Sequence, residues 1–331
     1  SAPPEGVEEY IGTGPYQFGE WKQDQYIHFT KFEDYQSPEG EANGLVGRKE
    51  ALVDDIYYHI VPDTSTRFAG LQTGEYDFAY GVPYDYYDQV QNDPNLEIIL
   101  TPAANAMMGF NNVQGLSTDT KFRQAINTAS DVEEIMMAAY PNPDFFWLHP
   151  GYMDVNITNW LTDAGGEYYN QNDLEKAKQL LAESNYNGEE FILMATRDYD
   201  HHYNMAVVIH EQLTELGINS KLDIYDWPTL LDIWANDFDR WDAYMTTAST
   251  VSTPTQLIAL DPGWAGGLYP EVSELLASIE TAPTLEESQQ LWDELQLLLW
   301  EDIQPIAHLG GYNSLYGYNK RAEGIRDLSG P

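Results

Sequence analysis

The chain has 331 residues and a formal net charge of −39 at pH 7, because 54 Asp and Glu stand against 15 Lys and Arg. This charge excludes nucleic acid and anionic membrane surfaces as natural partners, since both require clustered Lys and Arg. The length predicts two domains, and 24 Tyr, 9 Trp and 11 Phe supply enough apolar surface for folded cores. The acidic residues are spread along the whole chain, which favours adaptation to high salt or an exposed extracellular setting over a cation-binding site.

The sequence contains no cysteine, which excludes disulfides, a thiolate nucleophile and Cys-ligated zinc. It also contains no apolar run of about 18 residues, so we expect no membrane-spanning segment. The residues that follow Ser1 have neither the basic nor the apolar region of a signal peptide. We therefore expect this sequence to be a fragment of a longer protein.

The first hundred residues predict strands and turns with a single helix. Apolar and polar residues alternate in the early segments, as they do in half-buried strands, and a polar loop is expected at 33–48. A short helix at 64–73 ends at Gly74. The expected strands are 16–21, 26–30, 56–61 and 76–80. This order of strand, helix and strand indicates an α/β sheet.

A second region begins near Ala104 and predicts βαβ units, and hence a second sheet. Its helices are recognised by apolar residues three and four positions apart. The expected helices are 120–140, 174–182, 203–216, 229–235, 271–279 and 285–301. The expected strands are 107–112, 191–195, 218–225, 243–247 and 303–309.

No catalytic signature is complete. His210 and Glu211 begin a zinc-protease motif, but Thr214 replaces its second histidine, so we interpret His210 as an ordinary helix residue. The nucleophile elbow and the phosphate loop are absent, and the dinucleotide fingerprint lacks its third glycine. We predict no enzyme activity, no cofactor and no metal site.

Two polar clusters leave alternatives open. The pair His201 and His202 could contribute to a metal site, could contact a ligand from a polar loop, or could lie in a solvated turn. Asp237, Asp239 and Asp242 could supply the paired carboxylates of a glycosidase, but they follow a helix within a loop, which favours a solvated turn.

Aromatic residues at the ends of the expected elements are more informative. Amphipathic rings in such positions often line a concave ligand site, although they can equally belong to the core or its rim. These residues are Tyr203, Trp227, Trp234, Trp241, Trp264 and Tyr312.

Six short motifs follow one another along nearly the whole chain. They are Gly12-Thr13-Gly14-Pro15-Tyr16; Val61-Pro62-Asp63 with Arg67; Leu71-Gln72-Thr73-Gly74-Glu75-Tyr76-Asp77; Gly109-Phe110-Asn111-Asn112 with Phe122-Arg123-Gln124-Ala125-Ile126; Tyr169-Asn170 with Lys176-Ala177-Lys178-Gln179-Leu180-Leu181; and Leu216-Gly217-Ile218-Asn219. In this order they resemble the family 5 extracellular solute-binding proteins, the oligopeptide, dipeptide and nickel receptors of ABC importers. One departure is Ser130-Asp131-Val132-Glu133, where the family usually has Asp-Arg followed by Glu or Lys.

The resemblance implies an α/β, periplasmic-binding-protein-like fold of class II, with two lobes joined by a hinge. Residues 1–104 would form part of lobe I, 105–309 would form lobe II, and 310–331 would return to lobe I. The family's chains normally begin upstream, with a signal sequence, a lipid-anchoring Cys and a first-lobe subdomain. We therefore expect the first lobe to be incomplete in this chain.

The resemblance also implies a ligand between the lobes. Peptide binders of the family hold the ligand's α-amino group with an Asp just before a Pro, but here that position falls near Thr250 or Val251. A peptide is the expected solute, and an uncharged solute such as an oligosaccharide is the alternative. The expected ligand-binding residues are Asn111, His201, His202, Tyr203, Trp227, Trp234, Met245, Thr247, Ser249, Thr250 and Tyr312.

The expected mechanism is capture without chemistry, in which ligand biases an open–closed equilibrium that a membrane permease reads. The hinge is expected near Ala104–Met107 and Leu309–Tyr312, where Gly310 and Gly311 allow flexing. The resemblance implies a monomer outside the cytoplasm, anchored through lipid. A secreted acidic glycan hydrolase and a solute receptor that feeds a sensor are the remaining alternatives.

Overall fold

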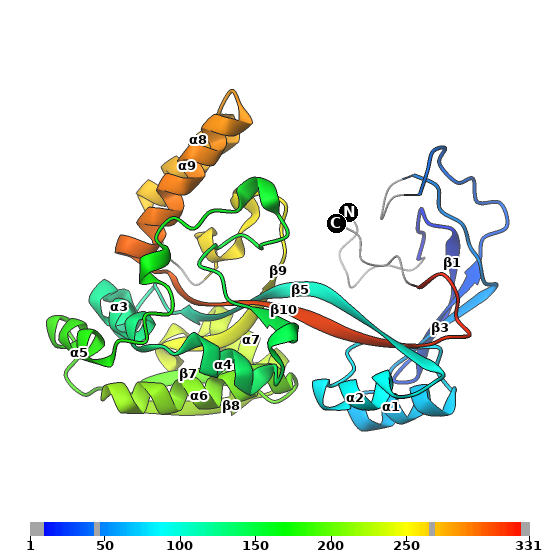
Figure 1. Ribbon diagram of the computed structural model, residues 1–331, viewed down its shortest axis with the longest axis horizontal. Helices are drawn as coiled ribbons and strands as arrows, with labels where there is room; N and C mark the ends of the chain where they lie inside the picture. Colours follow the sequence, from blue (N-terminus) through cyan, green and yellow to red (C-terminus); the bar gives the residue numbers. More distant parts are fainter. Residues whose placement is uncertain (1–9, 43–46, 265–268, 326–331) are drawn as a thin grey trace. The chain divides into compact units, whose positions relative to one another are not determined.

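The computed structural model describes residues 10–42, 47–264 and 269–325 (Figure 1). The chain divides into two compact units: unit 1 is formed by 1–101 with 315–331, and unit 2 by 102–314. Two long strands, β5 (Leu96–Phe110) and β10 (Ile306–Asn319), belong by sequence to both units. The lobe boundaries at 104 and 309 remain a prediction.

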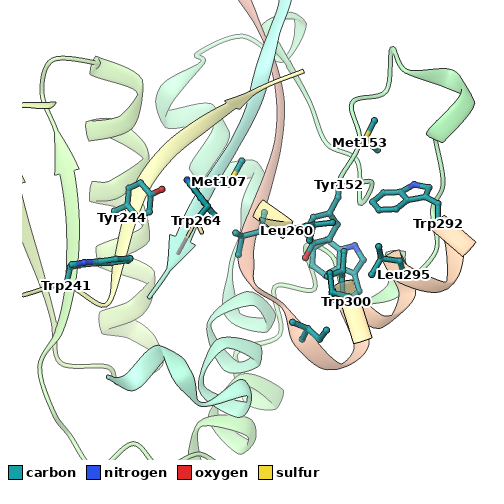
Figure 2. Close-up of a cluster of buried hydrophobic side chains, with 14 of the residues drawn as sticks. Met107, Tyr152, Met153, Trp241, Tyr244, Leu260, Trp264, Trp292, Leu295 and Trp300 are labelled. Carbon is teal, nitrogen blue, oxygen red and sulfur yellow. The ribbon is translucent and has the colours of Figure 1, made fainter. Parts of the chain in front are cut away.

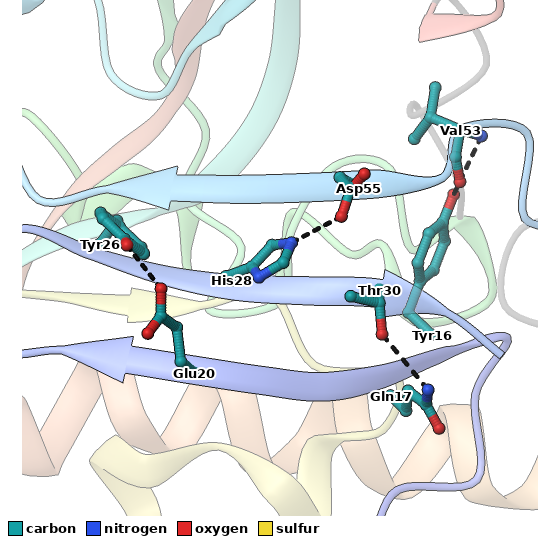
Figure 3. Close-up of polar contacts among 8 residues, drawn as sticks. All are labelled: Tyr16, Gln17, Glu20, Tyr26, His28, Thr30, Val53 and Asp55. Carbon is teal, nitrogen blue, oxygen red and sulfur yellow. Dashed lines mark hydrogen bonds and ion pairs between the residues drawn. The ribbon is translucent and has the colours of Figure 1, made fainter.

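Unit 1 contains a three-stranded antiparallel sheet in the order β1-β2-β3. Its strands are β1 (Tyr16–Lys22), β2 (Tyr26–Lys31) and β3 (Asp55–His59). The neighbouring strands are joined by side chains as well as by backbone (Figure 3): Tyr26 donates to Glu20 at 2.6 Å, and His28 pairs with Asp55 at 2.7 Å. These strands confirm the prediction from alternating polarity.

The second part of unit 1 comprises α1 (Thr64–Thr73), β4 (Phe78–Ala79) and α2 (Tyr87–Gln91). Helix α1 has the predicted bounds, because both its ends are capped. The Asp63 carboxylate accepts a hydrogen bond from the Thr66 amide, and Gly74 takes the left-handed conformation at φ 76°. Its apolar face packs Phe68 and Leu71 into a small core with Leu315 of β10.

Unit 2 is built on a sheet in the order β10-β5-β9-β7-β8, with the short β6 (Phe146–Trp147) paired to β10. The parallel strands β7 (Phe191–Thr196) and β8 (Ser220–Tyr225) are connected by helix α6 (Asp200–Leu216), which confirms the predicted βαβ unit. Strand β9 (Ala243–Ser249) pairs with β5 antiparallel and with β7 parallel.

The described part of unit 2 contains further α-helices besides α6. They are α3 (Thr120–Ala129), α4 (Val132–Ala139), α5 (Leu174–Glu183), α7 (Trp227–Asn236), α8 (Pro270–Thr281) and α9 (Leu285–Leu298). Helices α8 and α9 form a hairpin (Figure 1).

Three predicted elements are corrected by the structure. The expected helix 120–140 is two helices, because Asp131 caps α4 by accepting from the Glu134 amide. Strand β5 begins at Leu96 rather than 107. The expected strand 303–309 begins at Ile306 and continues to Asn319, and it is preceded by a single π-helical turn, Leu299–Ile303.

The buried Arg123 of α3 fixes the end of that π-helical turn. Its Nε donates to the Gln304 carbonyl at 2.9 Å, its Nη1 to the Ser117 carbonyl at 2.8 Å, and its Nη2 to the Ile303 carbonyl. One guanidinium therefore satisfies carbonyl groups at a helix terminus that would otherwise lack partners.

The main core of unit 2 is rich in large aromatic residues (Figure 2). Tyr152 packs edge-on against Trp300, with ring centroids 5.4 Å apart, and Trp241 packs edge-on against Tyr244 at 5.5 Å. Trp292 and Leu295 of α9 join the same cluster. This core anchors the walls of the cavity described next.

Candidate ligand-binding site

A cavity of about 500 Å³ lies within unit 2. Its walls come from β5, β9, β10, α7 and the segments around 152–154 and 256–264. The lining residues are Asn105, Met107, Tyr152, Asp154, Trp227, Leu231, Trp234, Tyr244, Thr246, Thr247, Ala248, Ser249, Val251, Gln256, Leu257, Ile258, Ala259, Trp264, Ile306 and His308. The volume suits a small solute or part of a peptide.

Helix α7 presents two tryptophans to this cavity. Trp227 and Trp234 are seven residues apart, so they lie on one face of the helix. The helix begins where Asp226 accepts from the Thr229 amide at 3.0 Å. Trp264 and Tyr152 contribute further rings and are anchored in the core (Figure 2). Large aromatic rings therefore form part of the cavity wall.

Among the described lining residues the cavity contains one carboxylate, that of Asp154, which is only 2% exposed. Its Oδ1 accepts from the backbone and the side-chain nitrogen of Asn156, at 2.8 and 2.7 Å. Its Oδ2 accepts one longer hydrogen bond, from Thr250 Oγ1 at 3.4 Å. The local turn holds one carboxylate oxygen firmly and leaves the other weakly engaged.

The imidazole of His308 also lines the cavity. Its Nε2 donates to the His149 carbonyl at 3.0 Å, and its ring stacks on Tyr152 with centroids 5.6 Å apart. Burial lowers the pKa of His308 to about 4. The ring is therefore neutral at pH 7.

Two polar groups of the cavity walls have no hydrogen-bond partner among the residues that the structure describes: Trp234 Nε1 and Tyr152 Oη. Burial raises the pKa of Tyr152, so its hydroxyl keeps its proton at neutral pH. Both donors are buried from solvent, and a buried donor without a partner is costly.

Strand β9 forms part of the cavity wall. Its pairing with β7 covers Ala243 and Tyr244, whereas its pairing with β5 continues to Ser249. Beyond Tyr244, β9 has no ladder pairing with β7 in the described part of the chain. Thr246, Thr247, Ala248 and Ser249 in this stretch line the cavity.

The structure brings together four of the predicted site residues: Trp227, Trp234, Thr247 and Ser249 all line the cavity. Thr250 lies beside it and donates to Asp154. Met245 lies on the same strand but is fully buried and is not among the lining residues.

His201, His202 and Tyr312 lie in an aromatic cluster that reaches the cavity through Trp227. His201 contacts His202 with ring centroids 4.6 Å apart and Tyr312 at 5.6 Å, and His202 lies 5.6 Å from Trp227. The solvated-turn alternative is wrong, because both histidines belong to the first turn of α6 and His202 is 3% exposed. Burial lowers their pKa values to about 4 and about 3.

The side chains of the other two predicted residues are already engaged. Asn111 is buried, and its Nδ2 donates to the carbonyls of Phe238 and Trp241, both at 2.9 Å. The hydroxyl of Tyr203 accepts from Arg197 at 2.8 Å, and the same guanidinium lies over the ring at 4.4 Å. Neither residue lines the cavity.

The acidic cluster after α7 is also not uniformly solvated. Asp242 is 9% exposed, and its carboxylate accepts from the Ile192 amide at 2.8 Å. Burial raises its pKa. The solvated-turn prediction is therefore wrong for Asp242, which anchors the start of β9 to β7.

The sequence patterns do not predict Asp154, Tyr152 or Gln256 as lining residues. They predict Trp264 only as one of the aromatic residues at the ends of the expected elements. A single Asp in an irregular loop carries no periodic signal.

Within 10–42, 47–264 and 269–325, no three His, Asp or Glu side chains group closely enough to hold a metal ion. No helix in those ranges has the length and apolarity needed to cross a bilayer.

Residues 2–263 match the family model for the bacterial extracellular solute-binding proteins, family 5. The chain belongs to this family. Membership of this family, which the six motifs predicted, is thus confirmed. A relative from Sinorhizobium fredii, a probable peptide ABC transporter periplasmic-binding protein, is 30% identical over 98% of this chain. The chain spans 64% of that relative's length.

Solved structures of family 5 proteins establish the fold. The oligopeptide-binding protein AppA of Bacillus subtilis, solved with a nonapeptide, aligns over 96% of this chain and 64% of its own, with a TM-score of 0.76 at 24% identity. The ABC transporter substrate-binding protein CtaP of Listeria monocytogenes aligns over 98% and 69%, with a TM-score of 0.80 at 21% identity. The predicted α/β, periplasmic-binding-protein-like fold is confirmed.

Proposed function

We propose that this chain is part of the substrate-binding component of an ABC importer, which captures a peptide-like solute and presents it to a membrane permease. The observation that carries the proposal is the cavity of about 500 Å³ within unit 2, with the rings of Trp227, Trp234 and Trp264 in its wall. The family and the peptide-binding relatives support it.

A peptide fits the cavity through its backbone. The β9 edge that follows Tyr244 can pair with an extended chain, because backbone groups on an open strand edge bind peptides as an added strand. Side chains of the peptide would pack against Trp227 and Trp264.

An oligosaccharide is the second candidate, because sugar rings also pack on tryptophan faces, and Trp227, Trp234 and Trp264 all line the cavity. Hydrolysis of that sugar is not proposed. Glycosidases use two carboxyl groups on either side of the scissile bond, whereas Asp154 is the one carboxylate among the described lining residues. We propose binding without turnover.

The rest of the proposal concerns the whole protein. We propose a monomer outside the cytoplasm, held at the membrane by a lipid anchor, with acidity that reflects a saline habitat. We also propose that β5 and β10 carry the hinge near Ala104–Met107 and Leu309–Tyr312. Gly311 has a steric role as well, since a Cβ there would overlap the Trp147 ring.

A thermal-shift screen in high salt tests the proposal, with mixed peptides, oligosaccharides and nickel complexes as separate panels. A ligand present at a hundredfold excess over Kd stabilises the folded state by about 2.7 kcal/mol. Trp234→Ala should weaken the response, whereas Trp21→Ala, which alters an exposed ring of β1, should not. Stabilisation by peptides that mass spectrometry recovers intact would support the proposal. A cleaved ligand, or a response that Trp234→Ala leaves unchanged, would contradict it.

A further inference from the structure

We propose that Asn156 is the acceptor of an asparagine-linked glycan. The inference goes beyond solute binding and depends on one part of the proposed function, the location outside the cytoplasm, because such glycans are attached to exported chains. It follows from the residues around Asn156 and from the place of this side chain on the surface of unit 2.

The residues Asn156-Ile157-Thr158 form the acceptor motif for asparagine-linked glycosylation, which is Asn, any residue except Pro, and then Ser or Thr. The sequence contains this motif once. Asn159 offers a direct comparison, since Leu161 stands where the motif requires a hydroxyl residue. The motif therefore distinguishes Asn156 from a close neighbour of the same chemistry.

The structure presents the motif to solvent. Asn156 and Thr158 are both exposed, and they lie in the long connection between β6 and α5, where Thr158 begins the single 3-10 turn Thr158–Trp160. Surface loops tolerate a bulky addition better than helices or strands do. The segment after the motif is held against α9, because Trp292 Nε1 donates to the Trp160 carbonyl at 2.9 Å. A glycan on Asn156 would thus be attached to an anchored surface loop.

The contacts of Asn156 are compatible with the modification. Its Nδ2 donates to Asp154 Oδ1 at 2.7 Å, and its backbone nitrogen donates to the same oxygen at 2.8 Å. The side-chain amide carries two hydrogens, and a linked sugar replaces one of them. The other hydrogen can keep the contact with Asp154, so the local turn is preserved. Because Asp154 lines the cavity, the glycan would be attached one side chain away from the cavity wall.

The transfer requires a sugar donor that the exporting cell supplies, an oligosaccharide joined through phosphate to a membrane lipid. The bond between the anomeric carbon and the phosphate oxygen breaks, and its electron pair stays on the phosphate. A new bond joins that carbon to Asn156 Nδ2, and the displaced amide proton passes to solvent. The step consumes no oxidant or reductant.

Mass spectrometry of the protein isolated from the cells that naturally produce it tests the proposal. A protease that cleaves before aspartate releases the peptide 154–162, which contains both Asn156 and Asn159. We expect this peptide to carry the added mass of the sugars, and fragmentation should locate that mass on Asn156. An unmodified peptide from exported protein would overturn the glycan alone. Recovery of the protein only from the cytoplasm would overturn the proposed location as well.

Three variants produced in the same cells test whether the motif directs the attachment. Thr158→Val should abolish the added mass, because Val has a similar shape but no hydroxyl, and Thr158→Ser should retain it. Asn159→Gln is the matched control and should remain modified, since the contact of Asn159 with Gln289 uses its backbone carbonyl. Added mass that persists in Thr158→Val, or that is lost in Asn159→Gln, would contradict attachment at Asn156 through this motif.

Discussion

We expect the buried His202 of α6 to cause a specific loss of folding stability in acid. His202 is 3% exposed, and neither of its ring nitrogens has a hydrogen-bond partner among the described residues. Burial lowers its pKa to about 3, with a smaller contribution from the neighbouring His201. An unfolded histidine titrates near 6.5. The unfolded state therefore binds a proton more readily than the folded state does.

The sign and size of the effect follow from these two pKa values. Because the folded-state pKa is the lower one, the stability contribution of His202 is fully present above pH 6.5 and is lost as the pH falls toward 3. Between pH 8 and pH 5 the loss is about 2 kcal/mol. His202→Phe should remove this loss, because Phe has a similar shape, does not titrate and sacrifices no hydrogen bond at this position.

Urea unfolding at pH 8 and pH 5, followed by tryptophan fluorescence, measures the effect. Eight of the nine tryptophans belong to unit 2, so the signal reports mainly on the unit that contains His202. The His202→Phe variant should gain about 2 kcal/mol relative to the unaltered chain when the pH falls from 8 to 5. His59→Gln, at an exposed position of β3, should follow the unaltered chain. A stability difference between His202→Phe and the unaltered chain that is the same at both pH values would refute this reasoning.

Two further substitutions test the packing of unit 2. Gly311→Ala should lower the thermal midpoint, because the new methyl group overlaps the Trp147 ring. Gly12→Ala is the control and should leave the midpoint unchanged, since a Cβ there meets nothing within 4 Å. Equal midpoints for the two variants would contradict the steric account. Arg123→Met should cost about 3 kcal/mol in urea unfolding, because it leaves the Gln304 and Ser117 carbonyls without donors. Arg123→Lys should rescue little, since one ammonium cannot reproduce the planar fork, and full rescue by Lys would show that charge alone matters.

The sequence predicted best those elements whose ends have local chemical signals. Helix α1 was located to the residue because Asp63 and Gly74 cap it. The sequence predicts β5 and β10 too short, because the segments 96–106 and 310–319 contain Pro, Asn or Gly, which interrupt a strand pattern. In the structure, pairing with neighbouring strands holds both segments in the sheet. The break between α3 and α4 was missed because apolar residues continue in helical spacing past Asp131.

Only part of the cavity lining could be predicted from the sequence. Aromatic residues at element ends and the Thr-Ser stretch of β9 pointed to Trp227, Trp234, Thr247 and Ser249. Asp154 comes from a loop more than 90 residues before Thr250, so its approach depends on tertiary structure alone. Asn111 and Tyr203 have side chains of the right chemistry, but their contacts within unit 2 already use them.

Hydrogen–deuterium exchange with and without a saturating peptide tests the central claim most directly. If the solute lies in the cavity of unit 2 and pairs with β9 beyond Tyr244, exchange should slow at residues 245–249 and on α7 around Trp227 and Trp234. The hairpin of α8 and α9 serves as an internal reference, since the cavity's lining residues in the described part of the chain include none from it. Unchanged exchange in β9 and α7, with peptide demonstrably bound elsewhere, would contradict the account.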